Sequence, residues 1–350
     1  MNVLYHLTAP PPALDNTDAV FQEVNALQSR FGGVQVQLYP FQRPGIRLPR
    51  AFYGWHRFSE LKASENTVDL HHLFANQLYP YPIFHWLKKP VIYSIVASVQ
   101  AQRLRSWPKW FSFAKFLVVS NVRDLLTLKK WGFKNCVHIR PGIDVDRFNV
   151  NVIDKGSAFN IVAGSAPWTH AQFKKKGFDL LLAVASTMPN IHLTLLWRGI
   201  FFNEIQERVK YYNLANRVEI INRKIDVNRV LAHAHAAIVL ADKPDIVKSY
   251  PHSLIEALAA GKPVLISNTI PMADYVKEQK CGQIVYDFTA ESVKKSIKKM
   301  IDDYADMQAA ALQVGQRDFS LQTMLDHYED IYLRSGYKFS ESQENASICN

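Results

Sequence analysis

Residues 248–264 have the residue types and spacing of an anion-binding helix start. His252 leads into Ser253, a favourable N-cap residue, and Glu256 follows three residues later. The backbone N–H groups at such a start, here near Ser253 and Leu254, suit a diphosphate, because they point outwards together with the positive end of the helix dipole. Ser253 and Glu256 also form a capping box, which requires no ligand. The residues alone leave both interpretations open.

A second segment combines a strand end with a lysine. Gly164 follows a short apolar run, where a residue without a side chain lets a ligand approach the backbone, and Ser165 comes next. Lys176 stands just before the next predicted helix, where an ammonium group can neutralise phosphate as a point charge. It ends a run of three lysines, which also fits a solvated face. The anion-binding segment downstream favours phosphate binding.

Three further residues are candidates by position. Arg198 ends a predicted strand, and a guanidinium there can bind phosphate with two hydrogen bonds. A surface arginine is the alternative. His72, beside His71, follows a strand predicted at 68–70, and Asn16 lies in the loop after the first strand. Both are candidates to point into a cleft, although a histidine pair in a loop is also commonly structural.

The elements that position these residues are predicted strands that alternate with predicted helices. Short apolar, β-branched runs alternate with amphipathic stretches, including predicted helices at 17–30, 121–131 and 319–334, which is typical of parallel sheets. Ligands of such sheets bind beyond the carboxyl ends of the strands. The predicted strands are 2–7, 34–39, 68–70, 91–95, 116–119 and 137–139, then 160–163, 191–196, 218–221, 236–240, 263–266 and 283–285.

A polar break after residue 140 divides the chain. The segment from Pro141 to Asp144 precedes a polar stretch, after which the alternation of predicted strands and helices resumes. We therefore expect two doubly wound α/β domains facing a cleft. The expected boundaries are 1–150 for the first domain and 151–318 for the second, with a helix at 319–335 crossing back to the first domain and a flexible tail at 336–350.

Together these segments resemble the signature of family 4 glycosyltransferases of the GT-B fold. The family pattern is Glu, seven residues, Glu, then an Ala-rich helix and Gly-x-Pro-Val. The resemblance implies that Glu256 binds the ribose hydroxyls of the donor nucleotide and that Lys176 contacts its diphosphate. Lys248 occupies the position of the first Glu. It is a candidate to pair with a phosphate or an anionic sugar, with a solvated loop lysine as the alternative.

The resemblance implies a sugar transferase that uses a nucleotide-diphosphate donor. The domain at 151–318 would bind the nucleotide-sugar, and the domain at 1–150 would form the acceptor side, with His72 and Asn16 as its candidate residues. Transfer would proceed with retention and without a metal or a cofactor, to a glycan, lipid-linked or small-molecule acceptor. No catalytic residue is assigned. The alternative is a non-catalytic GT-B protein that binds a sugar nucleotide or a protein partner, which is favoured by Lys248 and by the lack of a histidine after the strand predicted at 91–95.

Composition and charge bound the location and the partners. The chain has 350 residues, a formal net charge of +10, and three widely spaced cysteines at 136, 281 and 349. The cysteines favour a reducing compartment, and the sequence contains no signal peptide or apolar run long enough to span a bilayer. We expect a cytoplasmic protein, with attachment to the inner face of the membrane as an open alternative. The positive charge favours anionic partners, but no motif supports nucleic-acid binding.

The segment 103–115 mixes basic and aromatic residues. Trp107, Trp110 and Phe111 would lie at the interface of an anionic bilayer, with lysine and arginine at the headgroups. The alternative is a helix whose aromatic side faces the core and whose basic side faces solvent.

Overall fold

The computed structural model describes residues 1–9, 18–40, 48–101, 108–154, 156, 158–197 and 200–336. Asn16, Arg198, residues 103–107 of the basic aromatic segment and the tail from residue 337 lie outside these ranges. Their predicted roles stay predictions.

The first half of the chain forms a parallel sheet with the strand order β2-β1-β3-β4-β5-β6. Its central strands are buried on both faces, which explains why they read as nearly continuous apolar runs. The strands are β1 (Val3–Leu7), β2 (Val34–Gln37), β3 (Leu70–Ala75), β4 (Val91–Ile95), β5 (Ala114–Val119) and β6 (Cys136–His138).

The second half forms another parallel sheet, with the order β12-β11-β10-β7-β8-β9. The chain reverses its direction of growth between β7 and β10, and this switch point is where open α/β sheets bind ligands. All six strands lie within one residue of their predicted limits. They are β7 (Phe159–Ala163), β8 (Ile191–Leu196), β9 (Val218–Ile221), β10 (Ala236–Val239), β11 (Val264–Ser267) and β12 (Gly282–Val285). The prediction of two doubly wound parallel-sheet domains is confirmed.

Helices and short 3-10 turns cover both sheets. The helices at 17–30 and 121–131 are confirmed, and their N-caps are Asp18, which accepts from the Val20 amide, and Asn121, which accepts from the Asp124 amide. The first half contains α1 (Ala19–Phe31), α2 (Phe58–Ser64) and α3 (Val122–Lys130), with the 3-10 turns η1 (Arg50–Phe52), η2 (Trp55–Arg57), η3 (Pro82–Trp86), η4 (Val99–Ala101), η5 (Pro108–Phe111) and η6 (Val145–Arg147). The second half contains α4 (His170–Lys175), α5 (Phe178–Ser186), α6 (Phe202–Tyr211), α7 (Val227–Leu231), α8 (His252–Ala259), α9 (Met272–Gln279), α10 (Ala290–Asp302) and α11 (Tyr304–Asp318). None of the helices in the described ranges is long and apolar enough to cross a membrane.

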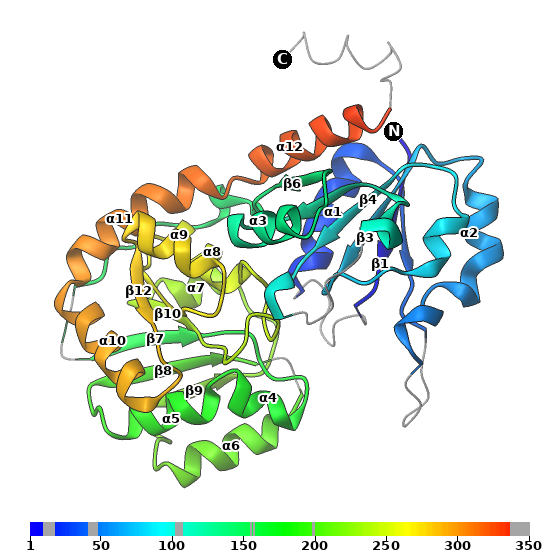
Figure 1. The fold of residues 1–350 in the computed structure, drawn as a ribbon. Helices are drawn as coiled ribbons and strands as arrows, with labels where there is room; N and C mark the ends of the chain where they lie inside the picture. The colour runs from blue at the N-terminus through cyan, green and yellow to red at the C-terminus, as the bar shows by residue number, and fades with distance from the viewer. Residues whose placement is uncertain are drawn as a thin grey trace.

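The last helix, α12 (Leu321–Arg334), leaves the second half and lies against the first (Figure 1). Its buried side chains, among them Tyr328 and Tyr332, join a core that contains α1 and the first sheet. An ion pair of 3.2 Å between Arg30 and Glu329 adds a surface contact. Helix α12 therefore stabilises the first half rather than the second.

The chain passes between the two halves twice, and the two connecting segments lie against each other. The Ile143 amide donates to Phe319 O at 2.9 Å, and the Leu321 amide donates to Ile143 O at 2.8 Å. A Cβ on Gly142 would lie 2.7 Å from Ser320 O, so only glycine allows this close approach. The two connecting segments are therefore paired with each other.

Candidate functional site

The end of β7 touches the start of α8. A Cβ on Gly164 would lie 3.0 Å from the Ser253 Cβ and 3.2 Å from its Oγ, so the missing side chain lets the two segments meet. The contact lies beside the switch point between β7 and β10. Two of the segments that the sequence singled out are thus brought together where an α/β domain is expected to bind a ligand.

Lys176 is buried beneath the loop that follows β7. Its side chain is 8% exposed, and Nζ donates to Ser165 O and Ala166 O at 3.1 Å each and lies 3.4 Å from Ser165 Oγ. Ser165 adopts a left-handed backbone with a φ of 66°, which costs free energy in a residue other than glycine. The ammonium group therefore holds a strained loop in place and adds a positive charge to its underside.

Gly164, Ser165 and Lys176 line a small hollow, together with apolar residues that include Phe178 and Leu240. Its volume of about 10 Å³ has room for about one water molecule, so a ligand would have to lie outside it, against the loop. Burial distinguishes Lys176 from the two lysines before it, because Lys174 is exposed and Lys175 is half-buried.

Helix α8 begins two residues earlier than predicted. His252 is its first residue, and Pro251 is the N-cap, without a side-chain hydrogen bond. The capping box is therefore wrong, because Ser253 already lies inside the first turn. The proline has no N–H group and an extended ψ of 122°, and its carbonyl accepts from Leu254 at 3.0 Å and from Ile255 at 3.2 Å.

The start of α8 presents two backbone donors. Within the described ranges, the amides of His252 and Ser253 have no hydrogen-bond partner, whereas the Leu254 amide is engaged inside the helix. The prediction that the Leu254 amide is available to a diphosphate is wrong, because this amide donates to Pro251 O. Glu256 is half-buried one turn later, four residues after His252 and three after Ser253, so all three share one helix face.

Lys248 and His252 face α1 across the domain boundary. Lys248 Nζ lies 3.3 Å from Asp18 Oδ1, and both side chains are mostly buried. His252 Nε2 lies 2.7 Å from Glu23 Oε1. The alternative of a solvated loop lysine is wrong, because Lys248 also pairs through its backbone with Ala97.

The histidines expected in the cleft lie inside the first sheet. His71 and His72 belong to β3, and neither side chain is exposed. His72 contacts the Tyr332 hydroxyl at 2.6 Å and Ser94 Oγ at 2.8 Å, so it ties α12 to the sheet. Burial lowers the pKa of His72 well below its usual value and keeps the ring neutral. The expectation that His72 lines an acceptor site is wrong, because its hydrogen bonds make it a core residue.

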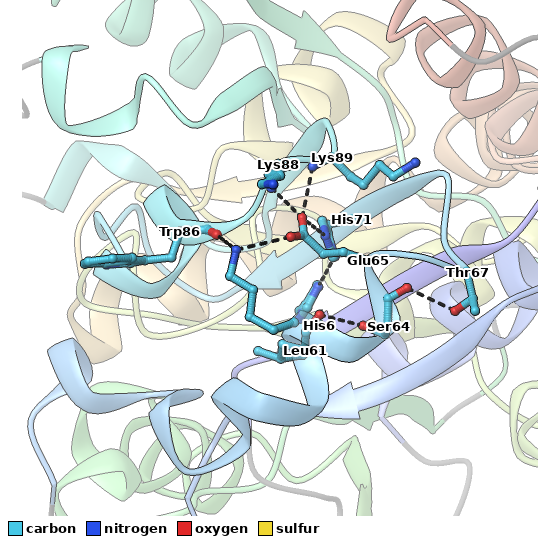
Figure 2. A network of polar contacts seen from close by, with 10 residues as sticks. His6, Leu61, Ser64, Glu65, Thr67, His71, Trp86, Lys88 and Lys89 are labelled. Carbon is cyan, nitrogen blue, oxygen red and sulfur yellow. Dashed lines mark hydrogen bonds and ion pairs between the residues drawn. The ribbon is translucent and has the colours of Figure 1, made fainter.

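His71 belongs to a separate buried network (Figure 2). Its Nδ1 lies 2.9 Å from His6 Nε2, and its Nε2 lies 3.6 Å from Glu65 Oε1. Burial lowers the pKa of His71 to about 4 despite the nearby carboxylate. Glu65 also accepts from the Lys88 amide, and from the Lys89 amide at 3.1 Å. This network fixes the turn before β4 and does not face the hollow behind Gly164.

Three acidic residues near the domain boundary were missed in the sequence. Asp18 and Glu23 belong to α1, where the sequence signals only a helix start and an exposed helix face. Asp124 accepts from Ser98 Oγ at 2.7 Å and lies 3.4 Å from Ser249 Oγ, so it links the halves. Burial raises the pKa of Asp124 although several donors oppose this effect. No sequence pattern indicates these long-range pairs.

The described part of the basic aromatic segment is divided between core and surface. Residues 108–111 form the turn η5, in which Phe111 is buried and Trp110 is 49% exposed. The expectation that Phe111 lies at a bilayer interface is wrong, because its ring packs against Phe133 and Tyr93. In the described part, 108–115, the alternative holds only for the core-facing Phe111, because this part forms a 3-10 turn and the start of β5 rather than an α-helix.

In the part of the chain that the structure describes, no group of three or more His, Cys, Asp and Glu side chains is arranged so that it could hold a metal ion.

Comparison with known proteins identifies the class of the second domain and of the fold. Residues 169–316 match the family model described as Glycosyl transferases group 1. The structure is similar to a glycosyltransferase from Rickettsia africae ESF-5, with a TM-score of 0.69 and 16% identity over 97% of this chain and 99% of that chain. It is similar to HepE from Anabaena in complex with UDP, with a TM-score of 0.70 and 12% identity over 95% of this chain and 100% of that chain. WaaG, a glycosyltransferase involved in lipopolysaccharide biosynthesis, gives a TM-score of 0.63 and 15% identity over 94% of this chain and 99% of that chain.

The structural matches confirm the predicted GT-B fold, and residues 169–316, less than half of the chain, match the model of group 1 glycosyltransferases. No curated protein sequence matches the chain. The narrower assignment to family 4 stays a prediction.

Proposed function

We propose that the protein transfers a sugar from a nucleotide-diphosphate donor to an acceptor, with retention of configuration and without a metal or a cofactor. The observation that carries the proposal is the contact between the Gly164 loop and the start of α8, within a domain that matches group 1 glycosyltransferases. This contact combines two outward-facing amides, a buried lysine and a carboxylate one helical turn away.

Each of these groups has a proposed role toward the donor. The amides of His252 and Ser253 bind the diphosphate, and Glu256 accepts hydrogen bonds from the ribose hydroxyls. Lys176 shapes the Gly164–Ser165 loop and offsets the charge that develops on the leaving diphosphate. Catalysis then rests on positioning and on electrostatic stabilisation, and no general base is assigned. UDP-sugars are the first donors to test, because HepE was solved with UDP and with UDP-glucose.

The acceptor is proposed as a glycan, a lipid-linked saccharide or a small molecule. We place the protein in the cytoplasm or at the inner face of a membrane. A second candidate is a non-catalytic protein that binds a sugar nucleotide. It is favoured by the pairing of Lys248 with Asp18, which occupies Lys248 at the position where family 4 enzymes have a glutamate.

A panel of UDP-, GDP-, ADP- and CMP-sugars, screened by thermal shift and titration calorimetry, tests the donor site. We expect one nucleotide to bind selectively and Glu256→Gln to weaken its binding about 10-fold, which matches the loss of a charged hydrogen-bond acceptor. Glu219→Gln is the control, since Glu219 is an exposed residue of β9. Binding that is unchanged in Glu256→Gln, or no binding of any nucleotide, would contradict the proposed site.

A further inference from the structure

The first domain exposes three tryptophans on one outer layer. The side chains of Trp86, Trp110 and Trp55 are 59%, 49% and 37% exposed. We call these residues the tryptophan face. Large aromatic side chains are usually buried, and a group of exposed ones marks an interaction surface. The tryptophan face lies outside the donor site described above.

Contacts between the elements show that the three tryptophans are neighbours. The Phe58 ring lies 5.4 Å from Trp55 and 6.4 Å from Trp86, measured between ring centroids. His85, the residue before Trp86, places Nε2 3.1 Å from Trp110 O. The turns η2, η3 and η5 and the start of α2 therefore form one continuous surface.

The tryptophans are held outwards by buried neighbours in the same turns. In η3, Ile83 and Phe84 have no exposed surface, whereas the next two residues are exposed. In η5, Phe111 is buried beside Trp110. Figure 2 shows the Trp86 ring pointing away from the buried Glu65–His71–His6 network. The outward rings are thus a fixed feature of these turns.

Most charged side chains around the tryptophan face are positive, and the exposed Glu60 of α2 is paired with Arg57 at 3.1 Å. Lys62 donates to Trp86 O, and Lys88 and Lys89 follow Trp86 in the turn that Glu65 fixes. Lys109 is exposed next to Trp110. Burial opposes ionisation of Glu65, but the Lys88 and Lys89 amides and Lys62 outweigh it, so the pKa of this carboxyl is lowered. Because the Glu65 carboxylate is buried and hydrogen-bonded, it does not face a partner at the surface.

We propose that the tryptophan face and the lysines around it bind the surface of an anionic lipid bilayer. Tryptophan prefers the interface between headgroups and acyl chains, and lysine side chains gain from the negative surface potential. A single-stranded nucleic acid would need a basic groove that follows its backbone, whereas these rings lie at the ends of three separate short turns. The formal net charge of +10 supports attraction to the same surface.

This inference goes beyond the proposed function and can be tested without turnover. It extends the sequence-based expectation of membrane contact at 103–115 to a surface built mainly by η2, η3 and α2. If the proposed sugar transfer also holds, a lipid-linked acceptor is favoured over a free glycan, and that extension alone rests on the proposed function.

Vesicle co-sedimentation of the full chain tests the proposal, with phosphatidylcholine vesicles and with vesicles that contain about one-third phosphatidylglycerol. We expect binding to the anionic vesicles only, weakened by added salt. Trp86→Ala/Trp110→Ala is expected to reduce binding roughly 10- to 100-fold, because two apolar anchors are lost. Lys88→Glu/Lys89→Glu is expected to reduce it at least about 20-fold, since each basic residue near the surface contributes about fivefold.

Matched controls lie on the other domain. Lys298→Glu/Lys299→Glu on α10 changes the net charge equally, and Tyr211→Ala removes a side chain that is 80% exposed. Both should bind vesicles within about twofold of the wild type if the surface is specific. Circular dichroism reports folding, and the lysine variant carries the test if the tryptophan variant is unfolded.

Three results would overturn the proposal. The wild type could fail to bind anionic vesicles, or the α10 variant could lose binding as much as the Lys88/Lys89 variant does. The third result is tight binding of single-stranded RNA that competes with vesicles and depends on Trp86 and Trp110, which would assign the face to nucleic acid.

Discussion

Replacement of Lys176 by methionine should destabilise the second domain, although the side chain keeps its length. The ammonium group donates to Ser165 O and Ala166 O, and Ser165 sits in a left-handed conformation that needs support. Methionine removes both hydrogen bonds and the charge while it fills most of the same volume. The loop carbonyls are then left beside an apolar side chain.

The magnitude follows from the two lost contacts. A hydrogen bond from a charged donor contributes about 1.5–3 kcal/mol, and the relief from no longer burying an ammonium offsets part of the sum. We therefore expect a loss of about 2–4 kcal/mol in the free energy of unfolding. For a domain of this size that loss corresponds to a fall of roughly 6–10 °C in Tm.

Differential scanning calorimetry and urea unfolding measure the loss, with Lys174→Met as the control. Lys174 belongs to the same run of lysines but is exposed, so its replacement should change the free energy of unfolding by less than about 0.5 kcal/mol. If the two variants are equally stable, the contacts of Lys176 do not hold the loop, and the reasoning from its hydrogen bonds is refuted.

Three further changes test other parts of the structure. Gly164→Ala should lower the free energy of unfolding by about 1–2 kcal/mol, because the new Cβ is pushed against Ser253. In thermal unfolding, the double variant with Ser253→Gly should regain most of this loss. A double variant no more stable than Gly164→Ala alone would contradict the close approach. A double-mutant cycle of Lys248→Met and Asp18→Asn, where Asn keeps the helix cap, should give a coupling of about 1 kcal/mol in urea unfolding, and purely additive effects would argue against the pair. Lys262 has no exposed surface, and burial lowers its pKa to about 8. The charged form is penalised only in the folded state, so Lys262→Met should raise stability at pH 7 by about 1–2 kcal/mol, after the lost hydrogen bond from Lys262 Nζ to Asn151 O is counted. This gain should shrink between pH 8 and 10.5, because the buried lysine of the folded wild type loses its proton at a lower pH than the lysine of the unfolded chain, which makes the wild type more stable there. Urea unfolding at pH 7 and pH 10 measures the gain, and an equal gain at both values would contradict the pKa argument.

The strands were predictable because most of them are buried on both faces and read as apolar runs. The exception is β3, predicted at 68–70 but observed at Leu70–Ala75. His71 and His72 interrupt its apolar pattern, and sequence reasoning placed them in a loop. They are tolerated in the core because Ser94, Tyr332 and His6 supply hydrogen bonds, and these partners lie far away in the chain.

The candidate site was predictable where it depends on local pattern and not where it depends on distant contacts. Gly164 and Lys176 were found from their places at a strand end and before a helix. The start of α8 was misplaced by two residues, because the extended conformation of Pro251 overrides the capping preference of Ser253. The pairing of Lys248 with Asp18 joins residues 230 positions apart, and no periodicity in the sequence reports it.

Donor turnover tests the central claim most directly. The measurement is the release of nucleoside diphosphate from the selected sugar nucleotide, in the presence of candidate acceptors, by the wild type, Glu256→Gln and the exposed control Glu219→Gln. We predict release by the wild type and by Glu219→Gln, with at least about 10-fold less from Glu256→Gln at subsaturating donor. Selective binding without release under any acceptor would contradict a transferase and would favour the non-catalytic sugar-nucleotide binder.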